Sequence, residues 1–447
     1  MRGVCLVDRS FYLLTLGCPK NTVDSEGMTQ ILLEAGYHEC AEPTAATFII
    51  VNTCAFIEAA RQESLAVLRE IAEQKRPGQK LVAAGCLSER NGGELQAAIP
   101  AVDACLSTRH WARIAEILDN LSSASNQRIR HSVSPSIVAP LVRHISPGVK
   151  TAYLKIADGC SAPCTFCVIP MIKGPAQSKP KELIRTEVQQ LTAVGMREII
   201  LIAQDTTAYG HDWGEREGLA HLLEDMVHWV PRGTWLRVMY AYPQHVTSRL
   251  IQVMAEHPSV CRYLDLPLQH AHPAVLRRMK RPSDVDAVRR LIESLRSAMP
   301  DIVLRTTFIV GFPGETDTEF QTLLDFMEEV AFDHVGIFTY SREEGTAAAS
   351  LPDQVPEVVK EARYTEAMAL QQEISHRRNQ RWVGRTFDVL IEGAGDGISI
   401  GRFYRDAPEI DGYVLIDGEW PIGEMQPVMI TSALEYDLLG VVTREDG

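Results

Sequence analysis

One short cysteine loop constrains the fold of this chain more than any other feature: Gly159-Cys160-Ser161-Ala162-Pro163-Cys164-Thr165-Phe166-Cys167. Three thiolates separated by three and then two residues can hold three corners of an iron–sulfur cube, and the loop supplies no fourth ligand. Clusters that only transfer electrons are normally closed by four cysteines, so the spacing indicates a reactive cluster whose open iron binds a small molecule. A structural zinc site is the alternative, but such sites are usually four-coordinate with paired ligands, and no further pair completes one.

The composition predicts a multidomain protein without a membrane-spanning segment. At about 100–200 residues per domain, the length suggests about three domains, and the 45% apolar share is ordinary for globular chains. The first apolar stretch, residues 11–16, is too short to span a membrane or to act as a signal peptide, so we expect a cytoplasmic protein. Ten cysteines in such a chain favour metal binding over a disulfide framework.

Residues 9–120 predict an open parallel α/β sheet domain. Apolar runs at 11–17, 47–53 and 80–85 are typical of strands, and the segments between them, 26–34 and 58–74, have helical patterns. Asp24 and Ser25 are candidate caps of the first helix. Near-continuous apolar strands that alternate with helices indicate a parallel sheet covered on both faces.

Three cysteines of this domain, Cys18, Cys54 and Cys86, each follow one of these strands. Ligands in open α/β sheets bind beyond the carboxyl ends of the strands, so thiols far apart in sequence can converge there. Each alone would be an ordinary buried cysteine, but together they predict a second three-thiolate cluster. The other cysteines lack this placement, and we interpret them as packing or surface residues: Cys5, Cys40, Cys105 and Cys261.

A linker is predicted at residues 121–145, where Ser, Asn, Pro and basic residues are mixed without periodicity. A second alternation of strands and helices fills residues 146–377, with strands expected at 152–157, 198–204, 235–240, 262–267, 303–311 and 334–340. Six such units fit a partial TIM-like (β/α)6 barrel better than a closed barrel of eight. Loops that follow the strands carry the chemistry in these barrels, and the cysteine loop follows the first strand.

Other strand ends of this barrel are candidate contacts for a cofactor. Gln204 and Asp205 end the second strand and suit amino or ribose groups, although such a pair can instead cap the next segment. Ile309 and Gly311 belong to an apolar strand and a Gly/Pro turn that either faces an adenine or is a simple tight turn. His270 is either near the substrate or a structural hydrogen bonder, and we assign no catalytic residue beyond the cluster ligands.

Residues 378–447 predict a small antiparallel β-barrel, because short alternating runs are separated there by Gly turns. Such barrels often bind nucleic acid. However, residues 381–447 contain five arginines, no lysine and thirteen acidic residues, a net charge of −8 out of −14 for the whole chain. An acidic face repels phosphates and attracts a basic protein, so we expect little or no direct nucleic-acid binding by this barrel.

These motifs together resemble the radical S-adenosylmethionine (SAM) methylthiotransferase family, and the resemblance covers nearly the whole chain. The family has an amino-terminal methylthiotransferase domain, a radical-SAM core and a small-barrel TRAM domain. Several segments are similar to its RimO branch: residues 16–21, 23–26, 52–54, 267–271, 279–282 and 406–412. The tRNA-modifying branch usually has Gln-Met-Asn after the first cluster cysteine, whereas this chain has Pro19-Lys20-Asn21.

The resemblance implies a transferase with two [4Fe-4S] clusters and SAM. Cys160, Cys164 and Cys167 would hold the cluster that binds and cleaves SAM, and Phe166 would border the adenine. Cys18, Cys54 and Cys86 would hold the cluster that carries the transferred sulfur. RimO enzymes add a methylthio group to the β-carbon of an aspartate in small-subunit ribosomal protein uS12, a basic protein that suits an acidic barrel. An electron donor and a sulfur source are also required, and the sequence identifies neither.

Two departures from the family and three other functions stay open at this point. Lys173 and Lys179 stand where the family commonly has arginine, and lysine keeps the charge but loses the planar fork. The nearest alternative function is a tRNA adenosine methylthiotransferase, which the acidic barrel disfavours. An iron–sulfur carrier or electron-transfer protein and a zinc-stabilised scaffold are more distant alternatives.

Overall fold

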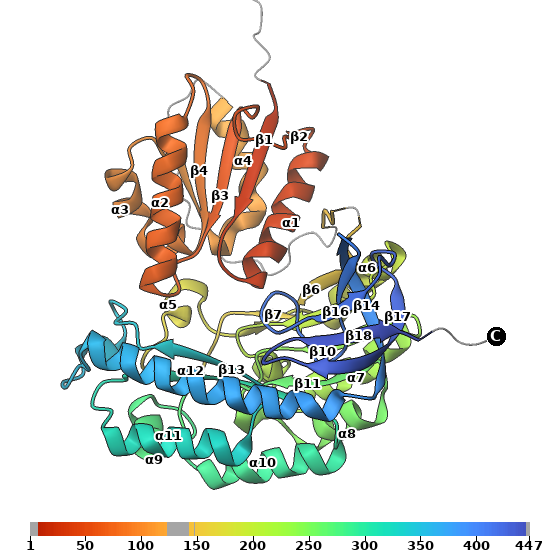
Figure 1. The fold of residues 1–447 in the computed structure, drawn as a ribbon. Coiled ribbons are helices and arrows are strands. Elements are labelled where there is room, and N and C mark those ends of the chain that lie inside the picture. Colours follow the sequence, from red (N-terminus) through yellow and green to blue (C-terminus); the bar gives the residue numbers. More distant parts are fainter. Residues whose placement is uncertain (1–7, 123–142, 147, 444–447) are drawn as a thin grey trace, which may run out of the picture. The chain divides into compact units, whose positions relative to one another are not determined.

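The computed structural model describes residues 8–122, 143–146 and 148–443 (Figure 1). The chain forms two compact units: the first contains residues 1–146, 153–161 and 167–187, and the second contains the remainder. Most of the predicted linker, and Cys5, lie outside the described residues. Within the described ranges, no helix combines the length and the apolar character needed to cross a membrane.

The sheet of the first unit has five parallel strands in the order β2-β1-β3-β4-β5 (Figure 1, red to orange). Its strands are β1 (Ser10–Thr15), β2 (His38–Glu39), β3 (Phe48–Thr53), β4 (Lys80–Gly85) and β5 (Ala104–Ser107). Its helices are α1 (Pro19–Glu34), α2 (Glu58–Gln74), α3 (Cys86–Ala98), α4 (Ile114–Ser122) and α5 (Ile169–Lys173). The unit also contains the two-stranded sheet of β7 (Ala157–Asp158) and β8 (Gln177–Ser178).

Both faces of this sheet are buried, as the apolar runs predicted. Alternate residues of β3 point to opposite faces, so that Ile49 joins a core with α2 and α3, and Ile50 joins one with α1 and α4. The predicted parallel α/β sheet is therefore confirmed. Strands β2 and β5 were not predicted, because they have only two and four residues.

The expected start of the first helix was wrong. Helix α1 begins at Pro19 with Cys18 as its N-cap residue, and Asp24 and Ser25 lie buried within it. Proline suits the first helical position because its fixed φ is already helical and its missing N–H is not needed there. Asp24 and Ser25 therefore cap nothing. Instead, Ser25 bonds Thr15 and Asn52, and Asp24 pairs with Lys155.

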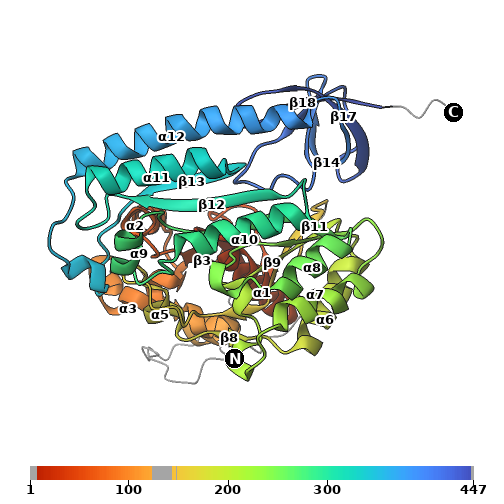
Figure 2. The same cartoon turned by 90° about the horizontal axis from the view of Figure 1, so that it is seen from below.

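All six strands predicted for the central sheet are present, in the order β13-β12-β11-β10-β9-β6. They are β6 (Thr151–Lys155), β9 (Glu198–Ile202), β10 (Trp235–Val238), β11 (Val260–Asp265), β12 (Val303–Val310) and β13 (His334–Thr339). The helices are α6 (Lys181–Ala193), α7 (Gly218–Trp229), α8 (Ser248–Glu256), α9 (Pro273–Arg278), α10 (Val285–Ala298) and α11 (Asp317–Val330). Figure 2 shows α8, α10 and α11 along the outer side of these strands. The sheet has two edge strands, as expected for a partial barrel.

Helix α12 (Glu357–Asn379) leads into a closed five-stranded barrel in the order β14-β15-β16-β18-β17. Its strands are β14 (Thr386–Gly395), β15 (Ile398–Arg402), β16 (Val414–Asp417), β17 (Met425–Ala433) and β18 (Leu438–Val442). The predicted barrel is confirmed, but β16 and β18 pair in parallel rather than antiparallel. Strand directions can alternate all the way around a closed ring only when the number of strands is even, so five strands require a parallel pair.

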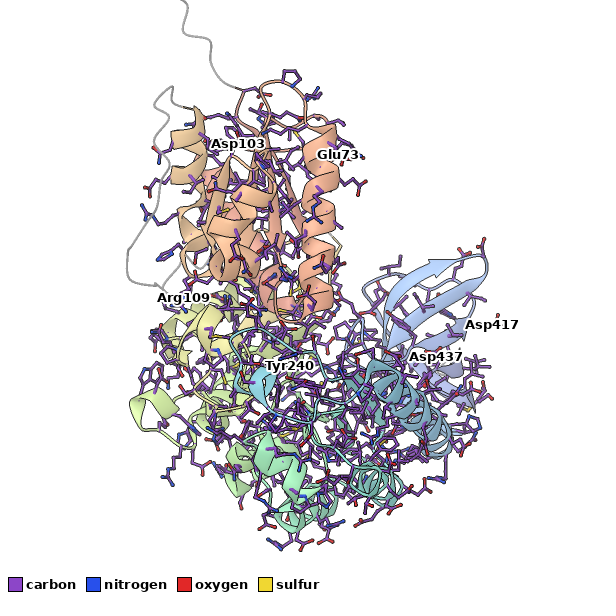
Figure 3. All side chains as sticks on the ribbon, turned by 90° about the vertical axis from the view of Figure 1, so that its left-hand side faces the viewer. Glu73, Asp103, Arg109, Tyr240, Asp417 and Asp437 are labelled. Atoms are coloured by element: carbon purple, nitrogen blue, oxygen red, sulfur yellow. The ribbon has the colours of Figure 1, made fainter. Side chains whose placement is uncertain are left out.

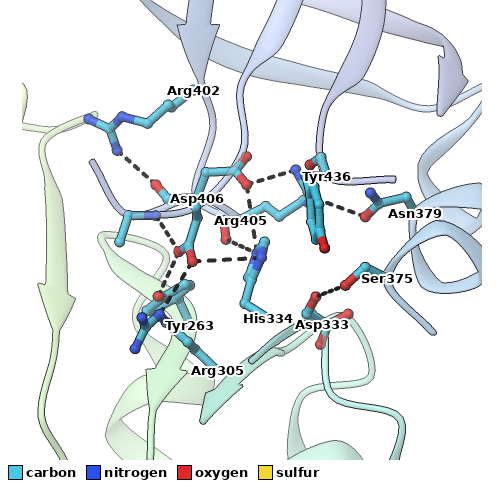
Figure 4. A network of polar contacts seen from close by, with 12 residues as sticks. Tyr263, Arg305, Asp333, His334, Ser375, Asn379, Arg402, Arg405, Asp406 and Tyr436 are labelled. Carbon is cyan, nitrogen blue, oxygen red and sulfur yellow. Dashed lines mark hydrogen bonds and ion pairs between the residues drawn. The ribbon is translucent and has the colours of Figure 1, made fainter. Parts of the chain in front are cut away.

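A buried polar network joins this barrel to the central sheet (Figure 4). Asp411 accepts hydrogen bonds from the Tyr263 hydroxyl at 2.7 Å and from the Ala407 N–H at 2.9 Å. Its carboxylate also lies 3.4 Å from Arg305 Nε and 3.6 Å from His334 Nδ1. The segment 406–412, which resembles the RimO branch, thus has a structural role in attaching the barrel.

We expect Asp406, in this network, to make stability depend on pH. Burial raises the pKa of Asp406 to about 7 although Arg405 opposes the shift. The folded state then holds this proton more tightly than the unfolded state, so the group stabilises the fold at low pH and loses this contribution as pH rises to 7. When the pH rises from 5 to 8, the unfolding free energy of the wild type should therefore fall by about 2–3 kcal/mol more than that of Asp406→Asn, which cannot titrate at this position.

Urea unfolding of both proteins at the two pH values measures this difference. Burial lowers the pKa of His334 to about 4. Because His334 is present in both proteins, its titration cancels to first order in the difference between their unfolding free energies. A stability difference that stays constant with pH would contradict the prediction.

Candidate cluster sites

The first unit brings Cys18, Cys54 and Cys86 together at the carboxyl ends of β1, β3 and β4. A Cβ atom added to Gly17, which has φ +92°, would lie 2.7 Å from Cys54 Cβ and 3.0 Å from Cys54 Sγ. Cys86 Sγ lies 3.9 Å from Asn21 Oδ1, and the Cys18 and Cys54 thiols are close enough to act on the pKa of Cys86. Glycine is needed at position 17 because any side chain would collide with Cys54.

The chemistry of this donor set fits an iron–sulfur cube. Among the described residues, no three or more His, Cys, Asp or Glu side chains are placed to hold a single metal ion. In a cube each thiolate binds a different iron, so its three sulfurs do not converge on one point. Burial raises the pKa of Cys54, and it raises that of Cys86 to about 12. Metal binding at these thiols therefore has to displace protons.

Polar residues that the sequence did not mark as candidates hold these cysteines in place. The Ser64 hydroxyl accepts a hydrogen bond from Cys54 N–H at 3.0 Å and donates one to Cys54 C=O at 2.9 Å. Asn21 donates to Leu16 C=O and Thr53 C=O, at 2.8 and 3.1 Å. Asn52 in turn donates to the Asn21 carbonyl at 2.9 Å. Asn21 and Asn52 lie in segments similar to the RimO branch, and this similarity could have identified them from the sequence. No motif includes Ser64.

Four charged side chains lie beside this cysteine set, three of them buried and the fourth, Asp158, 16% exposed. Lys173 Nζ is 3.3 Å from both Asp24 Oδ2 and Asp158 Oδ2, and Lys155 pairs with the same two carboxylates. We call these four residues the buried quartet. Burial alone would lower the pKa of Lys173, but Asp158 and Asp24, followed by the Cys86 and Cys18 thiols, raise it well above its usual value. Lysine at position 173 therefore places a permanent positive charge next to two of the three cysteines.

Lys179, the second departure from the family, lies in a separate buried pair. Its Nζ is 2.6 Å from Glu187 Oε1, and both side chains are less than one-tenth exposed. Burial lowers the pKa of Lys179 even though Glu187 opposes the shift.

The loop 159–167 passes from the first unit to the second and back, and its three cysteines are partly exposed. In the first unit, Cys160 N–H donates to Gly174 C=O at 3.0 Å, and Cys167 Sγ accepts from Ile169 N–H at 3.5 Å. Gly159 has φ +76°, and a Cβ there would lie 2.1 Å from Pro175 O. The glycine that precedes the cysteines is thus required by both its conformation and its close backbone neighbour.

In the second unit, the middle of the loop is held by segments far away in sequence. Thr165 donates from its N–H to Met279 C=O at 3.0 Å and from its hydroxyl to Arg278 C=O at 2.9 Å. Its own carbonyl accepts from Ala348 N–H at 2.9 Å. Arg281 Nη1 lies 3.9 Å from Cys164 Sγ. The segment 279–282, another mark of the resemblance, thus supports the loop directly.

Of the predicted cofactor contacts, Phe166 and Ile309 lie together. Both pack against a buried apolar cluster that includes Phe312, whose ring is 6.4 Å from that of Phe166 and meets it edge-on. Gly311, with φ +71°, faces Lys360, since a Cβ there would lie 2.3 Å from Lys360 Cγ. This apolar wall suits a flat ring.

The other polar candidates have structural partners. Asp205 caps the short turn that follows, accepting from Ala208 N–H at 3.1 Å, and it lies 2.8 Å from His245 Nδ1. This geometry fits the capping alternative, and Gln204 precedes it just beyond the end of β9. His270 is buried and accepts from His272 N–H at 2.9 Å, as a structural hydrogen bonder would.

Three family models match the chain. Residues 10–107 match "Uncharacterized protein family UPF0004", residues 154–327 match the radical SAM superfamily, and residues 383–443 match the TRAM domain. The chain is thus similar to known families in each of its three predicted parts.

Curated relatives are similar over nearly the whole chain. The ribosomal protein uS12 methylthiotransferase RimO of Roseiflexus sp. (strain RS-1) is 51% identical, over 96% of this chain and 96% of the relative. The RimO of Chloroflexus aurantiacus is 49% identical over 96% and 99%, and that of Desulfitobacterium hafniense is 44% identical over 98% and 99%.

Solved structures share the fold at low identity. The radical SAM methyltransferase TsrM of Kitasatospora setae, with cobalamin and a [4Fe-4S] cluster bound, has a TM-score of 0.58 at 13% identity. The match covers 88% of this chain and 77% of TsrM. At this identity the likeness concerns the fold alone.

Proposed function

The chain belongs to the RimO family of ribosomal protein uS12 methylthiotransferases, and we propose that it places a methylthio group on the β-carbon of an aspartate in uS12. The observation that carries the proposal is the gathering of Cys18, Cys54 and Cys86 in a chain that also has the radical-SAM loop. A SAM enzyme that only cleaves SAM needs no second set of thiols. Sulfur insertion requires a second site that supplies the sulfur.

The chemistry at an aspartate β-carbon requires cofactors, because its C–H bond is too weakly acidic for a side-chain base. When bound, the two [4Fe-4S] clusters and SAM supply one-electron cleavage of SAM and the transferred sulfur. Cys160, Cys164 and Cys167 hold the cluster that binds SAM, and Cys18, Cys54 and Cys86 hold the other. An external electron donor and a sulfur source complete the reaction.

The chain's own residues orient these groups. Phe166 and Ile309 provide an apolar wall for the adenine, with Gly311 beside it, while Gln204 and Asp205 are polar candidates at the end of β9. Lys173 keeps a positive charge beside Cys86 and Cys18, where thiolates carry negative charge in a loaded cluster. Ser64 and Asn21 fix the approach of the cysteine-bearing turns, which sets the geometry of the ligands.

The C-terminal barrel meets the basic protein substrate rather than RNA. Figure 3 shows Asp417 and Asp437 on this barrel, and both belong to the segment that carries a net charge of −8. Such a surface attracts a lysine- and arginine-rich protein and repels phosphates. The curated relatives described above are uS12 enzymes, which favours this substrate over tRNA adenosine.

Mass spectrometry of uS12 from strains with and without the gene tests the proposal. We expect one aspartate of uS12 to gain the mass of a methylthio group in place of hydrogen only when the gene is present. The modified nucleosides of tRNA from the same strains serve as the control and should not change. A methylthio group lost from tRNA, with uS12 unchanged, would refute the proposed substrate.

A further inference from the structure

A basic segment spans the end of helix α9 and the turn after it, in a chain that is otherwise acidic. Residues 277–281 read Arg-Arg-Met-Lys-Arg, with four positive charges and no acidic residue, whereas the chain has a net charge of −14. We call residues 277–281 the basic turn. Such a concentration of one sign attracts partners of the opposite sign.

The basic turn is bonded to the radical-SAM loop. Thr165 donates to two of its carbonyls, those of Arg278 and Met279, and Arg281 lies against Cys164 Sγ. Arg281 also stacks on the Tyr242 ring, 4.1 Å from its centroid, and donates to Pro267 C=O at 2.5 Å. The path from the surface of this turn to a cluster cysteine is therefore a few hydrogen bonds long.

Two of the four cations have side-chain partners among the described residues, and two do not. Arg278 forms two bonds with Glu319, at 3.0 and 3.1 Å, and Arg281 has the contacts given above. Arg277 and Lys280 are exposed, and within the described part of the chain neither side chain has an ion-pair or hydrogen-bond partner. Their charges are thus available to another molecule.

Lys280 occupies a backbone conformation that glycine would adopt more easily. Its φ is +51°, and the bonds from Lys280 N–H to Arg277 C=O and from Arg281 N–H to Leu276 C=O close the end of α9. Helices with this ending usually have glycine at the left-handed position. A side chain there costs stability and is typical of functional sites. The Lys280 side chain is exposed and unpaired among the described residues, so its charge can meet another molecule.

We propose that the basic turn docks an acidic protein that donates one electron to the cluster held by Cys160, Cys164 and Cys167. This inference rests on the proposed function, which needs an external electron. For a reduced flavoprotein donor, the flavin hydroquinone anion loses one electron and becomes the neutral semiquinone, and the cluster gains that electron without proton transfer. A donor bound at this turn would have a short route to Cys164.

The test uses reduced flavodoxin as the acidic donor and the full-length protein with Arg277→Gln and Lys280→Gly. These changes leave the carbonyls of Arg278 and Met279 in place, and Lys280→Gly alone should keep or raise the melting temperature because it removes the strained side chain. We expect flavodoxin to bind the cluster-free double variant about ten-fold more weakly than wild type at low salt, with a shallower salt dependence. The control is Arg69→Gln, which removes an exposed charge of α2.

The reconstituted proteins provide the second readout. The ratio of flavodoxin-driven to dithionite-driven SAM cleavage should fall in the double variant and stay unchanged in Arg69→Gln, because dithionite needs no docking surface. Failure of the proposed function would appear as no SAM cleavage with either reductant in wild type. Unchanged flavodoxin binding in the double variant would overturn the inference. The same holds if flavodoxin binding is unchanged and the variant binds ribosomal RNA more weakly, because the basic turn would then be an RNA contact.

Discussion

Replacing Cys160, Cys164 and Cys167 by alanine should abolish SAM cleavage and leave about four irons per chain after anaerobic reconstitution. The reason is that the remaining triad, Cys18, Cys54 and Cys86, lies in the first unit and is positioned by Gly17, Asn21 and Ser64. Iron and sulfide analysis, together with chromatography of 5′-deoxyadenosine, measures both quantities.

The reciprocal variant is the matched control for this experiment. With Cys18, Cys54 and Cys86 changed to alanine, about four irons should again remain. This variant should cleave SAM and transfer no methylthio group to uS12. Iron at background in the first variant would contradict the two-cluster proposal, because it would show that the amino-terminal thiols hold no cluster of their own.

Lys173→Met should destabilise the first unit by about 3–5 kcal/mol, since removing one partner of a buried ion pair leaves an uncompensated charge. Lys173 is 3% exposed and 3.3 Å from both Asp24 and Asp158, which would then share Lys155 alone. The same change removes a positive charge beside Cys86 and Cys18. In the variant that lacks Cys160, Cys164 and Cys167, it should therefore also lower the amount of iron retained.

Urea unfolding and iron analysis separate the two effects. Lys179→Met removes the partner of Glu187 in another buried pair and should destabilise the protein without a specific loss of iron. Lys173→Arg restores the residue that the family commonly has and should retain iron as wild type does. Equal iron retention in Lys173→Met and Lys179→Met would show that the Lys173 charge does not support the cluster.

Local patterns in the sequence predicted the regular elements well. The helix expected at 58–74 and the strand expected at 80–85 have these bounds in the structure, as α2 and β4. Helix α11 begins after Thr316, whose side chain and that of Glu319 form a capping box. Hydrophobic periodicity predicts these elements because each helix buries one face and each parallel strand buries both. The pattern of apolar residues within the element itself therefore reveals its type.

The sequence failed where a polar residue has a distant partner. Asp24 and Ser25 have the composition of a helix cap, but Asp24 pairs with Lys155, 131 residues away. Asp411 is likewise of a residue type that is common in turns. Its partners Tyr263 and Arg305, however, are more than one hundred residues away. No local rule reports such pairs, because their energies depend on a burial that only the folded chain creates.

By itself, the sequence predicted two cysteine sets, a three-part organisation and the types of the main elements, because thiol spacing and hydrophobic period are local properties. Only the tertiary structure decided what surrounds the cysteines: the buried quartet beside Cys86, the turn that holds Thr165, and the strained Lys280. These features arise from chain segments that are distant in sequence and adjacent in space. There, burial turns ordinary charged and polar side chains into strong, specific partners.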